Sequence, residues 1–393
     1  MDRLSKVRRK YRLGIFLDHP IQYFSPLFDE LSRRGDVVLS VGYSNDHGLR
    51  EALDPGFGST HKWDIDLVSG HSHSFMTAGQ RGWAMKIRAI PRVIRFIREN
   101  DIIVVHGYAG LLPLTAIAAA WVFRIPYLIR SDTSVIRTHR RLDPRFWLPR
   151  MVSRRSAGGL VAGIRNESVQ LKLGVPQTYF APFSIDNRRF SAAASSVRAK
   201  CGHSKAKWGL KSDKPVIGYC GKLIDHKGID DLVAAHRQLA DSAQLFIIGD
   251  GPNRAELEKQ CSPQLTVFAG FINQSEIPEA LAVCDIVVLP SYAEPWGLAI
   301  NEAMASGCLP VVSDAVGCGP DLVEGVGEVF PVGDRAELVG ALQRALARCQ
   351  DPLVKARIGE RIDDFDINKT ADGYELATWS VMAKRSHVSV PVR

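Results

Sequence analysis

Short apolar runs, rich in β-branched residues and separated by helical patterns, most constrain the fold of this 393-residue chain. Such alternation is typical of parallel sheets covered by helices. The first series of runs comprises residues 13–17, 37–43, 102–106, 127–129 and 160–162, and the second comprises 216–220, 245–248, 266–268, 286–289 and 310–313. We therefore predict two open, doubly wound α/β sheets whose ligand sites lie at the carboxyl ends of the strands, with a cleft between the domains.

The break between the two series spans residues 185–213 and includes a Ser- and Ala-rich stretch at 191–196. Low-complexity stretches of this kind are typical of interdomain linkers. We predict an amino-terminal Rossmann-like domain at 1–185, a linker at 186–212, a second domain at 213–350 and a helical tail at 351–393 that could cross back to the first domain.

Composition excludes several classes of protein. Hydrophobic residues make up 46% of the chain and charged residues 23%, which is the balance of a globular rather than a disordered chain. The longest apolar run, 111–123, is too short to span a bilayer. The basic residues at 1–10 are followed only by the short run 13–17, so we expect no secretory signal. We predict a cytoplasmic protein.

The sequence gives no sign of a metal site. The seven cysteines include no C-x-x-C pair, which favours reduced thiols over disulfides or zinc ligands. His71 and His73 come nearest to a ligand pair, and we expect them to lie in a solvated loop.

The net charge of +8 is unevenly distributed. Residues 1–190 contain 29 basic and 16 acidic residues, a net charge of +13, whereas 191–393 contain 21 and 26, a net charge of −5. The basic half is expected to meet an anionic partner. No nucleic-acid-binding motif accounts for that charge.

A loop with two lysines follows the first strand of the second series. Gly221 and Lys222 come directly after this strand, and Lys227 precedes a helix start at Gly228. Two ammonium groups beside a helix amino terminus suit a pyrophosphate, although a solvated loop is a common alternative. Gly251 belongs to a second strand-to-helix turn, Gly249-Asp250-Gly251-Pro252, which is not a G-x-G-x-x-G fingerprint.

The most informative segment is 289–307, where a buried strand is followed by a loop and a helix. Glu294 lies on the loop and Glu302 about one turn into the helix, so the two carboxylates can accept hydrogen bonds from vicinal hydroxyls. The backbone N–H groups of Trp296, Gly297 and Leu298 open the helix and favour a negative group. The alternative is a capping carboxylate followed by an exposed helical glutamate.

Together these segments resemble the nucleotide-sugar half of the GT-B retaining glycosyltransferases of family 4. The resemblance rests on G-K-L-x3-K-G (221–228), G-D-G-P (249–252), F-A-G-F (268–271) and P-S-Y-A-E-P-W-G-L-A-I-N-E-A-M-A-S-G (290–307), and it continues through 311–323. It implies a fold of two Rossmann-like domains facing a central cleft, no metal or other cofactor, and sugar transfer from a UDP- or GDP-sugar to a hydroxyl group with retained anomeric configuration.

The same resemblance assigns roles to individual residues. It implies that Glu294 holds the transferred sugar and Glu302 the ribose, and that Lys222 and Lys227 neutralise the diphosphate. The family more often has Arg at the first lysine position, so Lys222 replaces a bidentate contact with a point charge. The backbone near Phe271 would frame the base.

The first half matches the family less closely. His106 ends a buried strand and is similar to the family histidine that lies near the reacting centre; the alternative is a histidine capping a strand edge. The loop after the first strand lacks the glycines of many relatives and presents Asp18, His19 and Gln22, which we expect to contact acceptor or sugar.

Two further polar residues, Arg130 and Asp132, follow another strand of the first half. We predict that Arg130 pairs with Asp132 or with an anionic acceptor. Asp132 is either an acceptor ligand or a helix N-cap.

Residues 81–98 have a helical pattern with an apolar stripe at Trp83, Ile87, Ile90, Ile94 and Ile97. Every charge before Glu99 is positive. One interpretation is a core-facing helix with a solvated basic side, and the other an interfacial helix on anionic lipid. The basic residues that could add to the same surface are Arg3, Lys6, Arg8, Arg9, Lys10 and Arg12.

The sequence thus predicts a glycosyltransferase for a bacterial surface-glycan or lipid-linked acceptor, located at the inner face of the cytoplasmic membrane. A sugar-nucleotide epimerase of the same fold is an alternative, which would consume the sugar nucleotide without an acceptor. A two-domain sugar-binding protein of the periplasmic type is a third, which would bind free sugar but no nucleotide.

Overall fold

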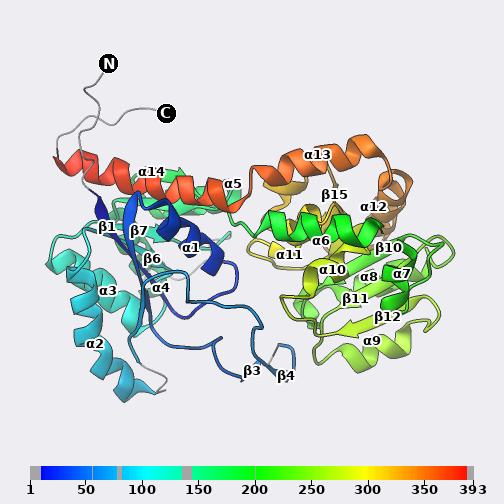
Figure 1. Cartoon of the computed structure of the whole chain (residues 1–393), viewed down its shortest axis with the longest axis horizontal. Coiled ribbons are helices and arrows are strands. Elements are labelled where there is room, and N and C mark those ends of the chain that lie inside the picture. The colour runs from blue at the N-terminus through cyan, green and yellow to red at the C-terminus, as the bar shows by residue number, and fades with distance from the viewer. Residues whose placement is uncertain (1–9, 55, 78–81, 135–143, 200, 387–393) are drawn as a thin grey trace.

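The computed structural model describes residues 10–54, 56–77, 82–134, 144–199 and 201–386. Two α/β domains lie side by side, and the carboxyl-terminal helix runs back across the first of them (Figure 1). Of the basic amino-terminal residues, Arg3, Lys6, Arg8 and Arg9 lie outside the described residues.

In the described part of the chain, the first domain contains a seven-stranded parallel sheet in the order β5-β2-β1-β6-β7-β8-β9. Its strands are β1 (Tyr11–Leu17), β2 (Val37–Tyr43), β5 (His73–Phe75), β6 (Ile102–His106), β7 (Tyr127–Arg130), β8 (Gly158–Val161) and β9 (Thr178–Phe180). A separate antiparallel hairpin, β3 (Ala52–Asp54) and β4 (Ser59–His61), leaves the sheet between β2 and β5. Both faces of the sheet are covered, which explains its continuous apolar runs.

The second domain contains a six-stranded parallel sheet in the order β12-β11-β10-β13-β14-β15 among the residues described. Its strands are β10 (Val216–Cys220), β11 (Gln244–Ile248), β12 (Thr266–Gly270), β13 (Ile286–Leu289), β14 (Leu309–Ser313) and β15 (Glu328–Phe330). The predicted fold of two doubly wound parallel sheets is confirmed. The sequence did not indicate β3, β4, β5, β9 and β15.

Helices cover both sheets (Figure 1). The first domain contributes α1 (Ser25–Arg34), α2 (Trp83–Arg98), α3 (Leu111–Val122), α4 (Pro144–Arg154) and α5 (Ile164–Leu173). The rest of the chain contributes η1 (Asp225–Lys227), α8 (Ile229–Arg237), α9 (Arg254–Gln260), α10 (Ile277–Ala282), α11 (Leu298–Ala305), η2 (Gly319–Val323), α12 (Arg335–Arg348), α13 (Pro352–Asp363) and α14 (Ile367–Ser386).

The segment predicted as a linker is helical. It forms α6 (Asn187–Ala199) and α7 (Cys201–Lys207), and α6 packs against α10 and α11 of the second domain. Phe190 is buried in this packing. The Ser- and Ala-rich stretch is therefore part of a docked helix rather than a free connector.

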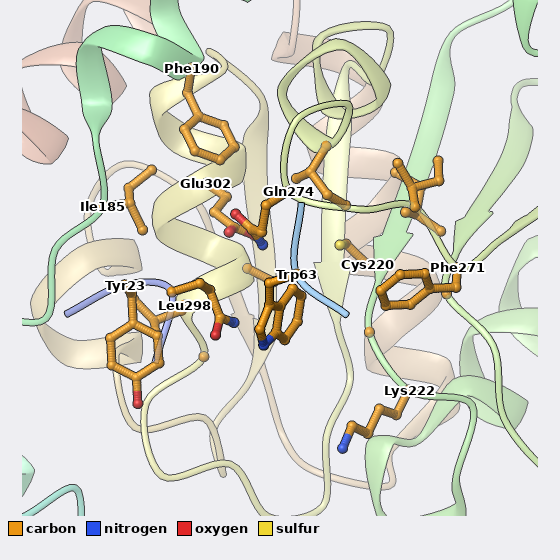
Figure 2. A pocket seen from close by; sticks show the side chains of 18 of the residues that line it. Tyr23, Trp63, Ile185, Phe190, Cys220, Lys222, Phe271, Gln274, Leu298 and Glu302 are labelled. Carbon is orange, nitrogen blue, oxygen red and sulfur yellow. The ribbon is translucent and has the colours of Figure 1, made fainter. Parts of the chain in front are cut away.

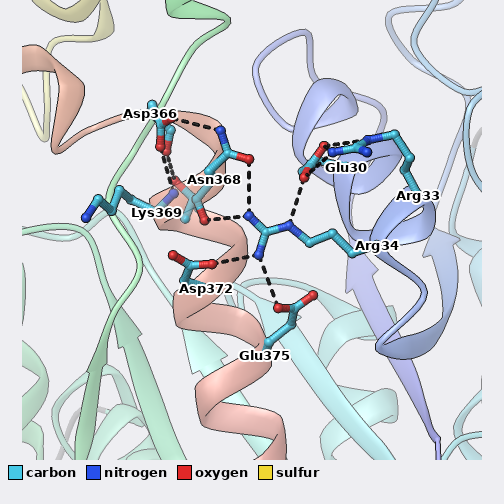
Figure 3. Close-up of polar contacts among 9 residues, drawn as sticks. Glu30, Arg33, Arg34, Asp366, Asn368, Lys369, Asp372 and Glu375 are labelled. Atoms are coloured by element: carbon cyan, nitrogen blue, oxygen red, sulfur yellow. Dashed lines mark hydrogen bonds and ion pairs between the residues drawn. The ribbon is translucent and has the colours of Figure 1, made fainter. Parts of the chain in front are cut away.

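The last helix, α14, returns to the first domain and packs on α1, β8 and β9. A single guanidinium joins α14 to α1, as Figure 3 shows. Arg34 donates to Glu30 at 2.8 Å, to Asp372 at 2.7 Å and to Glu375 at 3.1 Å, and it also reaches the Asn368 carbonyl at 3.1 Å. Only 17% of the Arg34 side chain is exposed, so these contacts fix the tail to the domain.

The apolar stripe predicted for 81–98 is partly wrong. The residues of α2 that face the core are Ala89, Val93, Phe96 and Ile97. Trp83 is instead 68% exposed and Ile87 47% exposed. Because these two residues are four apart, they lie on the same outer face of the helix.

His71 does not lie in a solvated loop, which corrects the prediction for this residue. Its side chain is buried, with Nδ1 2.8 Å from Asp29 and Nε2 2.9 Å from the Tyr43 hydroxyl. Among the described residues, no group of three or more His, Cys, Asp or Glu side chains is arranged to hold a metal ion. No described helix is both long and apolar enough to span a membrane.

Candidate active site in the interdomain cleft

A cavity of about 440 Å³ lies between the two domains and receives side chains from both. Figure 2 shows this pocket. Nine of the residues singled out in the sequence line it: Gln22, Gly221, Lys222, Lys227, Phe271, Glu294, Gly297, Leu298 and Glu302. The carboxyl ends of β10, β11 and β13 therefore open into the cavity, as expected for a doubly wound sheet.

The two lysines reach the cavity from the loop between β10 and α8. Gly228 ends this loop with φ of 66°, and a Cβ there would lie 2.2 Å from the Pro290 carbonyl oxygen. Only glycine allows this close approach at positive φ. The turn places Lys227 in an ion pair with Glu294, and Lys222 pairs with Asp54 of the first domain at 2.9 Å.

Glu294 lies on the loop between β13 and α11, which is held by backbone hydrogen bonds. Its carbonyl accepts from the Gly317 N–H at 2.9 Å, and the Trp296 carbonyl accepts from the Cys318 N–H at 3.0 Å. Only 14% of the Glu294 side chain is exposed. The carboxylate is thus fixed beside a cation at the cavity wall.

Glu302 lies on α11 and faces the cavity beside Arg189 and Gln274. Burial raises the pKa of Glu302 to about 7, although the charge of Arg189 and a hydrogen bond with Gln274 act in the opposite direction. Arg189 itself donates to the Gln274 carbonyl at 3.0 Å. The Glu302 carboxyl therefore has few fixed partners and can accept hydrogen bonds from a ligand.

Aromatic rings from both domains meet in the cavity. The rings of Phe271 and Phe57 meet edge to face at 5.0 Å, and the Trp63 ring lies 6.3 Å from Phe271. The Trp63 indole occupies the middle of the pocket in Figure 2, between Leu298 and Phe271. Such rings suit a flat heterocycle.

Two predicted residues of the second domain shape the site without lining it. Gly251 allows close backbone approach, because a Cβ there would lie 2.5 Å from the Leu223 carbonyl oxygen. The Trp296 side chain is buried and donates from Nε1 to Asn301 at 2.9 Å.

Of the three residues predicted in the loop after β1, Gln22 lines the cavity, and its neighbour Tyr23 lines it as well. Asp18 and His19 do not line it and instead contact each other at 3.3 Å. The hydrogen bond with His19 holds the pKa of Asp18 below its usual value. Asp132 is exposed, and no described helix begins there, so the structure does not support the N-cap alternative.

Arg130 is buried and His106 is partly buried, and neither lines the cavity, which corrects the prediction that Arg130 meets an acceptor. The Arg130 guanidinium is buried, donates to the Ala181 carbonyl at 2.7 Å and lies 4.7 Å from the Phe183 ring centre. His106 Nε2 lies 2.9 Å from the Tyr374 hydroxyl. Burial, together with the charge of Arg130, holds the pKa of His106 well below its usual value, so the imidazole is neutral.

Comparison with the sequences of known proteins identifies the family. The chain is 31% identical over 304 residues to a 2-deoxystreptamine glucosyltransferase of Streptomyces kanamyceticus, an alignment that covers 70% of this chain and 76% of that protein. The chain belongs to the glycosyl transferases group 1 family. The family model matches residues 202–359, which include the four charged residues Lys222, Lys227, Glu294 and Glu302.

Solved structures show that this glycosyltransferase has the GT-B fold. The sucrose-phosphate synthase of Thermosynechococcus elongatus superimposes with a TM-score of 0.70 at 18% identity, covering 95% of this chain and all of that one. HepE of Anabaena, in complex with UDP and glucose, superimposes with a TM-score of 0.69 at 17% identity, covering 94% of this chain and all of that one. The expected fold of two Rossmann-like domains is confirmed.

Sequence reasoning missed several residues of the glycosyltransferase cavity, which are Tyr23, Phe57, Trp63, Arg189 and Gln274. Arg189 was assigned to a linker, and Phe57 and Trp63 lie in or just after the short hairpin. A polar hairpin with few apolar positions gives no periodic signal. The pair of aromatic residues six apart, between two strands of the first domain, was the only available hint.

Proposed function

We propose that this protein is a retaining glycosyltransferase of family 4 that moves a hexose-type sugar from a UDP- or GDP-sugar to an acceptor hydroxyl. One observation carries the proposal: Lys222, Lys227, Glu294 and Glu302, from separate segments of the second domain, converge on one cavity. Two cations suit a diphosphate, and two carboxylates suit the hydroxyls of a sugar and a ribose.

The leaving diphosphate would be stabilised by this chain's own charges. Lys222 and Lys227 carry the positive charge, and the amino terminus of α11 at Gly297 adds a backbone dipole directed at the same place. We propose that these groups stabilise the leaving diphosphate without a metal ion.

In the proposed reaction, the bond between the anomeric carbon and the phosphate oxygen breaks while the acceptor oxygen attacks from the same face. The departing phosphate takes the acceptor's proton. Glu294 orients the transferred sugar, and Lys227 holds this carboxylate in place. We assign no nucleophile, and we assign His106 no step in the reaction.

The test of this function is a panel of UDP-, GDP- and dTDP-sugars incubated with hydroxyl acceptors. We expect one donor to be consumed in an acceptor-dependent manner, and NMR of the product to show the donor's anomeric configuration. Inverted product would refute retention, and consumption without acceptor would indicate the epimerase instead.

We further propose that the acceptor is a bacterial surface glycan or a lipid-linked sugar reached at an anionic membrane. The outer face of α2 presents Trp83 and Ile87 together with the exposed residues Lys86, Arg88 and Arg95. An exposed face that combines aromatic, aliphatic and basic side chains suits the headgroup region of a bilayer.

Vesicle flotation tests this surface. We expect the protein to float with vesicles containing phosphatidylglycerol and not with pure phosphatidylcholine, and binding to fall as salt rises. Trp83→Ala should weaken flotation several-fold, whereas Val38→Ala, which changes an exposed apolar residue of β2, should not. Equal flotation of both variants would contradict the proposed contact between α2 and the membrane.

A further inference from the structure

A segment of the first domain crosses the cleft and contacts the second domain at several points. We call it the crossing segment and define it by Asp54, Phe57, Lys62, Trp63 and Asp64. The Lys62 carbonyl accepts from Asn273 Nδ2 at 2.7 Å. The Asp64 carboxylate accepts from the Ser275 N–H at 3.1 Å and from its hydroxyl. The segment therefore forms a wall of the cavity.

Asp54 forms an ion pair with Lys222, the residue that we propose binds the diphosphate. Both carboxylate oxygens lie 2.9 Å from Lys222 Nζ. The segment also packs closely there, because a Cβ on Gly56 would lie 2.5 Å from Lys222 Cδ. Burial raises the pKa of Asp54, but the hydrogen bond with Lys222, the charge of Lys222 and the backbone N–H groups of Gly56 and Phe57 together keep the pKa below its usual value. Asp54 is thus an anion placed where a phosphate would bind.

The aromatic side chains of the same segment line the cavity, and Phe57 lies close to Lys222. Lys222 Nζ lies 5.0 Å from the Phe57 ring centre, and the Phe57 ring meets Phe271. Trp63 and Phe271 both line the cavity (Figure 2). An anion partner and a set of flat rings, next to each other, match the two parts of a nucleoside diphosphate.

We propose that the crossing segment is a part of the donor site contributed by the first domain: Trp63 packs against the nucleobase opposite Phe271, and Asp54 holds Lys222 until the diphosphate replaces it. The inference rests on the proposed function. It predicts that substitution of Trp63 changes the binding of the base and that substitution of Asp54 changes the binding of the diphosphate. It also predicts that the segment covers part of the site before the donor binds.

The experiment is calorimetric titration of the full chain with three probes. They are the nucleoside diphosphate that binds the wild type, chosen from UDP and GDP, then its nucleoside, and inorganic pyrophosphate. The variants are Asp54→Asn, in which the side-chain oxygen can still accept from the Gly56 N–H, and Trp63→Ala. Trp147→Ala, at an exposed tryptophan on α4, is the matched control.

We expect Asp54→Asn to bind the diphosphate and pyrophosphate about threefold more tightly, because the substitution removes a half-exposed ionic competitor for Lys222. Its affinity for the nucleoside should be unchanged. Trp63→Ala should bind the nucleoside and the diphosphate about tenfold more weakly, and its affinity for pyrophosphate should be unchanged. Melting curves of all variants check that each remains folded.

Three results would overturn the inference alone, and the first two are wild-type binding that neither variant changes and equal loss of binding of all three probes in Trp63→Ala. Weaker pyrophosphate binding in Asp54→Asn would also overturn it, since Asp54 would then support Lys222 rather than compete for it. A wild type that binds neither UDP nor GDP would instead refute the proposed function, and this inference with it.

Discussion

The carboxyl edges of the two sheets have opposite surroundings. In the second domain, the loops after β10 and β13 carry Lys222 and Glu294 into an open cavity. In the first domain, the strands β6 and β7 end in His106 and Arg130, and α14 places Tyr374 against both. The strand ends therefore form a binding wall in the second domain, whereas in the first domain the ends of β6 and β7 are largely packed and the loop after β1 brings Gln22 to the cavity.

The difference arises from a helix that is remote in sequence. Thr370 of α14 donates to the Pro182 carbonyl at 2.9 Å, just after β9, and Arg130 donates to the same carbonyl and to that of Ala181. A buried guanidinium is tolerated there because carbonyl oxygens and aromatic faces replace water. A residue's place at the end of a strand thus predicts that it lies at the carboxyl edge of the sheet. It does not predict whether a ligand can reach the residue.

The largest expected effect concerns the carboxyl edge of the second domain's sheet, which opens into the cavity. Glu294→Gln keeps the shape of the side chain but removes the charge beside Lys227, and we expect kcat/KM to fall about 10²–10³-fold, the usual cost of losing a charged contact in the transition state. Glu256→Gln, an exposed glutamate on α9, is the control. Near-normal transfer by Glu294→Gln would remove the contrast between the two edges.

A second test uses the pH dependence of Glu302. Its pKa is about 7 in the folded chain and near 4.5 when unfolded, so the folded state binds more protons between these values. The free energy of unfolding therefore falls as pH rises from about 4.5 to 7, by about 3 kcal/mol for this group. Urea unfolding of the wild type and of Glu302→Gln should show the difference between them growing over this range. A difference that is independent of pH would contradict the burial of this carboxyl.

A smaller effect is expected where α14 is fixed to the first domain (Figure 3). Arg34→Ala leaves Glu30 and Glu375 without their shared cation, and we expect the free energy of unfolding to fall by about 2 kcal/mol. Arg33→Ala, at an exposed side chain that pairs with Glu30, should change it by less than about 0.5 kcal/mol. Equal effects of the two variants would show that α14 is held by other contacts.

Much of the second domain could be predicted from sequence because its site is local. Each of the segments 221–228 and 290–307 directly follows its strand and contains its turn and its functional side chains, so spacing along the chain sets their geometry. The cavity confirms that these segments meet.

The first domain could not be predicted to the same depth because its surroundings are set by distant segments. Tyr374 lies 268 residues after the histidine it contacts, and Asp54 lies 168 residues before Lys222. No local pattern encodes such pairs. The stripe on α2 was misassigned for a related reason: two registers of apolar residues compete, and packing against α3 selects Ala89 and Val93 over Trp83 and Ile87.

The most direct test of the central claim is calorimetric titration of the wild type and of Lys222→Ala with UDP and GDP. We predict that the wild type binds at least one of them and that Lys222→Ala weakens this binding about tenfold or more, because a charge-assisted contact to the diphosphate is lost. The matched control Lys259→Ala, on the exposed face of α9, should bind like the wild type. Binding of neither nucleotide, or equal binding by wild type and Lys222→Ala, would contradict the account.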